Sequence, residues 1–117
     1  MREIKIGEQT IGLRASPLAL LFYKQEFGRD LVGDLMKLLN VEEEPETFDS
    51  VLFLQIAWAM AKAEKGLNKQ FPSFINWVSN LEYFDVSDTN IIQPIADEAL
   101  DGFFRAANKP QEAGSGK

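Results

Sequence analysis

The chain has 117 residues, enough for one domain, and its 45% apolar content with nine Phe excludes an intrinsically disordered protein. Its 18 acidic and 12 basic residues give a formal charge of −6, which argues against nucleic acid as a partner because phosphate backbones are bound by basic surfaces. Cysteine and histidine are both absent, which excludes disulfides, thiolate metal ligands and the commonest general base of enzymes.

A β-hairpin is predicted at the N-terminus. Isoleucines alternate with charged or polar residues in the segments 3–6 and 10–13, as in strands with one buried face. Between them, Gly7 and Glu8 supply a tight turn, because glycine readily adopts the positive φ that such turns need. Two strands alone are only marginally stable in water, so we expect the hairpin to pack against helices.

The next segments predict two short helices. Ser16 and Pro17 form a helix start, in which the Ser16 hydroxyl would cap a free amide, and Gly28 provides a left-handed end. Asp30 is placed to cap a second helix over residues 31–39. We expect this helix to turn one apolar face to the core, formed by Leu31, Leu35, Leu38 and Leu39.

The third predicted helix follows an acidic linker at residues 41–47 and extends from residue 48 or 49 to Lys65. Apolar residues occur on all of its sides, and a helix without a polar face is usually enclosed by other elements. We therefore predict that this helix is central in the core, with Trp58 buried. Its apolar run, residues 51–61, is well below the ~20 residues needed to span a bilayer.

Two more helices are predicted toward the C-terminus. The fourth opens at residues 71–73 and runs to about Leu81. The last begins between residues 90 and 93, because Pro94 is tolerated best in a first turn, and it carries an apolar stripe at positions 92, 95, 96, 99, 100 and 103. The predicted fold is mostly α, with a small N-terminal β-hairpin followed by a compact bundle of about five helices.

The sequence predicts a single helical domain over residues 1–106, including the hairpin, and a flexible C-terminal tail at residues 107–117. Arg2, Glu3 and Lys5 interrupt the N-terminus where a signal peptide needs an apolar core. We therefore expect a cytoplasmic protein without a membrane partner.

Two acidic clusters are candidates for a cation site. Asp97, Glu98 and Asp101 lie on neighbouring turns of the last helix, where carboxylates could hold Mg²⁺, and Glu42–Glu46 could loosely hold Ca²⁺. For both clusters, a solvated surface is the better explanation than a cation site. The first would be the polar face of the helix, opposite the apolar stripe. The second lacks the Asp/Asn and Gly pattern of a calcium loop. We expect no catalytic residue, no metal and no cofactor, in a protein that is not an enzyme.

Aromatic side chains are the candidates for partner contact. Five of them fall within residues 71–84, more than one short helical stripe normally buries, and the adjacent pair at 103–104 cannot both face inward on a straight helix. Exposed aromatic residues are common in protein interfaces. Core packing and a partner surface are the two alternatives for these residues, which are Phe71, Phe74, Trp77, Tyr83, Phe84, Phe103 and Phe104.

Three segments together resemble the tail assembly chaperones of long-tailed bacteriophages and prophages. They are the opening REIKIGEQTIGLRASPLALLFYKQEFGRDL, the central FDSVLFLQIAWAMAKAEKG and the following FPSFINWVSNLEYFDV. The similarity covers nearly all of residues 1–106 and consists of hydrophobic patterns.

The resemblance implies a function that the composition does not show. Members of this family bind the long tape measure protein, keep its apolar helices soluble and help to recruit tail tube subunits around it. They self-associate, many occur in two lengths through a programmed frameshift, and they are absent from the finished particle. On this basis we expect the tape measure protein as the partner, the tail tube protein as a further one, and self-association in the host cytoplasm.

Two other functions fit the same composition. One is an unrelated, non-enzymatic adaptor or antirepressor-type regulator encoded by a prophage or other mobile element. The other is a small enzyme that uses the carboxylates of Asp97, Glu98 and Asp101, and the missing His and Cys make it the least favoured. A very long, helix-rich reading frame just downstream would favour the chaperone over both.

Overall fold

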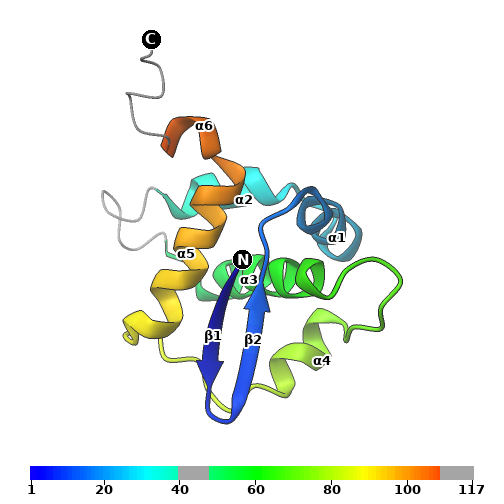
Figure 1. Ribbon diagram of the computed structural model, residues 1–117, viewed down its shortest axis with the longest axis vertical. Helices are drawn as coiled ribbons and strands as arrows, with labels where there is room; N and C mark the ends of the chain where they lie inside the picture. Colours follow the sequence, from blue (N-terminus) through cyan, green and yellow to red (C-terminus); the bar gives the residue numbers. More distant parts are fainter. Residues whose placement is uncertain (40–47, 109–117) are drawn as a thin grey trace.

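The computed structural model describes residues 1–39 and 48–108 (Figure 1). An antiparallel hairpin, β1 (Arg2–Ile6) and β2 (Gln9–Leu13), is followed by α1 (Pro17–Phe27), α2 (Leu31–Leu38), α3 (Ser50–Lys65), α4 (Phe74–Ser79) and α5 (Thr89–Phe103). A short helical turn, α6 (Arg105–Asn108), comes last. The prediction of a mostly α fold with an N-terminal hairpin and five helices is confirmed. The predicted acidic linker and residues 109–117 of the predicted tail lie outside the described residues.

The hairpin is attached to the helices by its apolar face. Ile4 lies opposite Ile11 in the antiparallel register, and both are buried together with Ile6 and Leu13. The turn between the strands contains Gly7 at φ 61°, in the left-handed region that favours glycine. β1 packs mainly against α5 and β2 against α3, so the expectation that the hairpin rests on helices is confirmed.

α3 is the central element. It packs against α1, α2, α4 and β2, and Figure 1 shows it running behind the hairpin. Asp49 begins the helix by accepting hydrogen bonds from the amides of Val51 and Leu52 at 3.0 and 3.2 Å. Trp58 is 0% exposed, and its Nε1 donates to the carbonyl of Pro72 at 3.0 Å. The predicted central position of this helix is confirmed. Among the helices described, none combines the length and apolar character needed to cross a membrane.

The ends of the first two helices differ from the expectation. Ser16 makes no side-chain hydrogen bond at the start of α1, and its backbone carbonyl accepts from the Ala19 amide at 2.9 Å instead. Pro17 at the first helical position has already removed one of the amides that would need a cap. α2 ends at Leu38, so Leu39 leaves the buried face and is 48% exposed.

The start and the inward face of α5 also differ from the prediction. The helix begins at Thr89, capped by Asp88, so Pro94 lies in the second turn and removes a backbone hydrogen bond there. Its buried residues are Ile91, Ile95, Glu98 and Ala99. Much of the predicted apolar stripe is only half-buried, namely Ile92, Ala96, Leu100 and Phe103.

Candidate functional site

The predicted aromatic residues of α4 and the segment before it pack onto the core. The rings of Phe71 and Phe74 lie 6.3 and 6.5 Å from the ring of Trp58, and Phe74 also meets Phe27 edge to face at 5.2 Å. Trp77 is buried. α4 ends at Ser79, earlier than predicted, yet its aromatic side still faces α3. Of the two alternatives for these residues, core packing fits the geometry.

The other predicted aromatic residues do not form one surface with them. The Tyr83 ring is exposed, while its hydroxyl accepts a hydrogen bond from the Gly7 amide in the hairpin turn at 3.2 Å. Phe84 is half-buried, with its ring 6.3 Å from that of Phe53.

Phe103 and Phe104 show how two adjacent aromatic residues both reach the core. α5 ends at Phe103, and Phe104 adopts the non-helical angles φ −127° and ψ 45°. Because the helix does not continue through Phe104, both rings pack partly buried against the core. A partner-binding role for the seven aromatic residues stays a prediction, and Tyr83 is the one among them that is exposed, at 48%.

The structure instead presents an apolar groove between α2, the start of α3 and α5. Its volume is about 230 Å³. Among the described residues, those that line it are all apolar, and the set comprises Leu35, Leu38, Leu39, Phe48, Phe53, Ile56, Ile92, Ile95, Ala96, Ala99 and Leu100. The groove suits the burial of apolar side chains from a partner.

Helix packing explains why the described elements leave a groove between them. α2 packs on α1 and α3, whereas α5 packs mainly on β1 and α6. The half-buried residues of α5, such as Ile92 and Leu100, therefore face a space that α2 does not fill. Sequence analysis missed this groove, although it carried one signal: Leu39 and Phe48, which flank the acidic linker, are large apolar residues at the ends of predicted helices.

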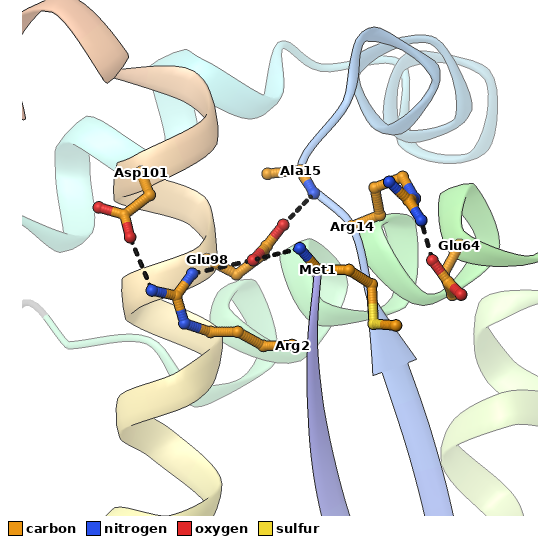
Figure 2. A network of polar contacts seen from close by, with 7 residues as sticks. All are labelled: Met1, Arg2, Arg14, Ala15, Glu64, Glu98 and Asp101. Atoms are coloured by element: carbon orange, nitrogen blue, oxygen red, sulfur yellow. Dashed lines mark hydrogen bonds and ion pairs between the residues drawn. The ribbon is translucent and has the colours of Figure 1, made fainter.

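Within the acidic cluster on α5, Asp101 is exposed as predicted, but Glu98 does not lie on a solvated face. Glu98 is only 6% exposed, and its Oε1 accepts from Arg2 Nη1 while its Oε2 accepts from the Ala15 amide, each at 2.9 Å (Figure 2). The second amino group of Arg2 donates to Asp101 at 2.7 Å. These contacts hold the hairpin and the following segment against α5. The prediction failed because Arg2 lies 96 residues from Glu98 in the sequence.

The same contacts argue against a cation site at this cluster. Both oxygens of Glu98 and one of Asp101 already accept hydrogen bonds from protein groups. Within residues 1–39 and 48–108, no three carboxylates, cysteines or histidines lie close enough together to hold a metal ion. The suggested calcium site at Glu42–Glu46 lies outside the described residues.

A second buried polar group joins the first three helices. Asp34 is 3% exposed and accepts hydrogen bonds from Arg29 at 2.7 and 2.9 Å and from the Tyr23 hydroxyl at 2.6 Å. The side-chain amide of Gln55 lies 3.1 Å from the same hydroxyl. The hydrogen bonds from Arg29 outweigh the effect of burial and lower the pKa of Asp34 to about 2, while burial raises the pKa of Tyr23. The carboxylate of Asp34 has its hydrogen-bond partners within the protein, so the role of this cluster is structural.

Comparison of the chain with protein-family models, with curated proteins and with solved structures found no match.

Proposed function

We propose that this protein is a phage tail assembly chaperone that binds the tape measure protein of its own element, keeps it soluble and assists assembly of the tail tube. The resemblance of the segments at residues 2–31, 48–66 and 71–86 to this family supports the proposal. The same resemblance supports self-association, contact with the tail tube protein, action in the host cytoplasm and absence from the finished particle.

The observation that carries the proposal is the apolar groove between α2, α3 and α5. A tape measure protein is a long helical chain, and its apolar residues aggregate unless another surface covers them. The groove offers such a surface on a body whose formal charge of −6 favours solubility. Binding of this kind needs no catalytic group.

Coexpression with the tape measure protein of the same element tests this function. We expect the soluble yield of the tape measure protein to rise, and we expect an unrelated acidic protein of similar size to have no such effect. A direct pull-down of tape measure segments with the purified chain checks that the effect is binding. If the wild-type chain captures no segment, the chaperone hypothesis is wrong and the adaptor hypothesis takes its place.

A further inference from the structure

We infer that the outer edge of β2 binds a short extended peptide segment from another protein, which adds to the hairpin as a third strand. The segment would occupy a hollow between β2, the end of α3 and α4. This hollow shares no lining residue with the apolar groove. The inference is therefore independent of the proposed chaperone function.

The register of the hairpin shows which backbone groups of β2 point away from β1. The strands are joined by a two-residue turn at 7–8, so the residues that flank this turn form a hydrogen-bonded pair. Hydrogen-bonded and non-hydrogen-bonded pairs alternate along an antiparallel ladder, so the amides and carbonyls of Thr10 and Gly12 point outward. Arg14 continues the alternation, because its outward amide donates to the Met60 carbonyl of α3 at 3.0 Å.

The outward backbone groups of Thr10 and Gly12 form an unpaired strand edge. Within residues 1–39 and 48–108, these groups make no hydrogen bond. The two residues offer two N–H donors and two C=O acceptors, and they lie about 7 Å apart along the strand. Such an edge is a template for another strand, since an extended peptide presents donors and acceptors in the same alternation.

A hollow of about 320 Å³ lies along this edge. β2 lines it with Thr10, Ile11 and Gly12, and Phe71 and Trp77 line it from α4 and the segment before this helix. Figure 1 shows α4 and the end of α3 on the side of β2 that faces away from β1. An incoming strand would therefore lie between β2 and the two aromatic rings. A single extended chain fits this position, whereas a strand of a folded sheet would bring its neighbouring strands into the rings.

Trp77 supplies a hydrogen-bond donor to the hollow, although the residue is only 8% exposed. The indole N–H of Trp58 donates to Pro72, whereas that of Trp77 has no hydrogen-bond partner among the described residues. Within the same part of the chain, Gln9 Oε1 is the one fully enclosed side-chain nitrogen or oxygen that lacks a partner. The Trp77 N–H is therefore open to the hollow, where a peptide carbonyl would accept a hydrogen bond from it.

The charged side chains at the hollow favour an uncharged peptide backbone over an ion. Glu3, Glu64 and Lys65 line the hollow, and Glu64 already pairs with Arg14 at 3.0 Å. Glu3 and Lys65 add one charge of each sign, and neither forms an ion pair with a described residue. A free anion or cation would meet a like charge beside each opposite one, whereas peptide groups carry no net charge.

The chain's own residues 109–117 are a poorer occupant. Pro110 has no amide to pair with a strand edge, and Gly114 and Gly116 have no side chain to pack against the aromatic rings. A segment of another protein has neither restriction.

NMR titration of the isotope-labelled full chain tests the inference. The probe is a blocked peptide of about seven alternating Thr and Val residues, with one Lys and one Glu at its ends for solubility. Because the edge recognises backbone groups, the exact side chains of the probe matter little. We expect the amide resonances of Thr10 and Gly12 and the indole N–H resonance of Trp77 to shift on binding. The same peptide with N-methyl groups on its central amides should bind at least about tenfold more weakly.

Two proline variants distinguish the two edges of the hairpin. Thr10→Pro removes an outward amide from β2, and Lys5→Pro removes the outward amide that lies opposite it on β1. We expect Thr10→Pro to weaken binding of the peptide at least about threefold, and we expect Lys5→Pro, the matched control, to leave the affinity unchanged. Trp77→Phe keeps an aromatic ring but removes the N–H, and it should also weaken binding at least about threefold. Thermal melting shows whether each variant is folded.

Three results would overturn the inference. One is the absence of shifts at Thr10, Gly12 and Trp77 at millimolar peptide. Another is equal binding of the N-methylated peptide, a comparison that uses the wild-type chain and so does not depend on the folding of any variant. The third is an equal loss of affinity in folded Thr10→Pro and Lys5→Pro chains. None of these results concerns the apolar groove, so capture of the tape measure protein tests the chaperone function separately.

Discussion

Trp58 shows how one side chain organises the centre of the molecule. Its ring lies 5.5 Å from Phe27 of α1 and 6.3 Å from Phe71 before α4, and its indole N–H reaches the Pro72 carbonyl. Lys62 adds its ammonium group 5.2 Å above the ring. A single residue of α3 therefore contacts both α1 and the segment that precedes α4.

Replacing Trp58 with Ala should lower the free energy of unfolding by roughly 3–5 kcal/mol, because the change leaves a cavity that its neighbours cannot fill. Denaturant unfolding followed by circular dichroism measures the loss. Iodide quenching gives an independent check in a Trp77→Phe background, where Trp58 is the sole fluorescent tryptophan. Ready quenching in the folded protein would show that Trp58 is accessible and that α3 is not central.

Asp34 makes stability depend on pH in a defined direction. Its pKa in the folded protein is about 2, below the ordinary value of 3.8, because Arg29 and Tyr23 donate hydrogen bonds to the ionised form. A carboxyl whose pKa is lowered by folding stabilises the protein fully above its unfolded pKa. That stabilisation is lost as the pH falls through the folded pKa, so here it disappears between about pH 4 and 2.

Asp34→Asn should therefore reduce the free energy of unfolding by roughly 2 kcal/mol near neutral pH. The difference in the free energy of unfolding between this variant and the wild type should narrow as the pH is lowered below 3.8. Chemical denaturation at a series of pH values measures both quantities, with Asp97→Asn as a control because Asp97 accepts a hydrogen bond from the uncharged Gln93. A gap that stays constant down to pH 2 would show that the charge of Asp34 is not what stabilises the fold.

At the scale of secondary-structure elements, both apolar and polar contacts attach the hairpin to the helices. The four buried aliphatic residues of the hairpin supply the apolar contact, and the Arg2–Glu98 pair supplies the polar one. The two partners differ in exposure, since Glu98 is buried while the side chain of Arg2 is 35% exposed. Loss of Arg2 would leave a buried carboxylate without its guanidinium partner, which is costly because the charge remains desolvated.

Arg2→Ala should cost about 1–3 kcal/mol, and it should increase hydrogen exchange of the β1 amides more than that of α3. Arg14→Ala is the matched control, because Arg14 makes an exposed ion pair with Glu64 at 3.0 Å and should change stability by less than about 1 kcal/mol (Figure 2). Equal effects of the two substitutions would contradict a special role for the Arg2–Glu98 pair.

At the scale of the whole molecule, the acidic charge offsets the aggregation risk that the apolar groove brings. An exposed apolar surface carries a risk of aggregation, and a net charge of −6 favours solubility. The groove uses residues from three elements that are separate in the sequence, and α5 contributes the part that the core leaves half-buried. This combination suits the proposed role of holding an apolar client in solution.

The sequence by itself determined the elements and the centre of the core. Alternating isoleucines marked the hairpin, and Gly28, Asp30 and Gly66 marked helix ends where the structure has them. An apolar run without a polar face marked α3 as central. These features are local, because hydrogen bonding and side-chain periodicity within a strand or helix depend on residues only a few positions apart.

The tertiary structure alone decided which residues lie at the groove and which charges are buried. Glu98 meets Arg2 across 96 residues and the Ala15 amide across 83. The inward face of α5 is set by β1, so Glu98 enters the interior and Ile92 turns toward α2. A helical pattern specifies which residues share a face, but the neighbouring elements determine how far that face is buried. The groove between the described elements follows from that packing.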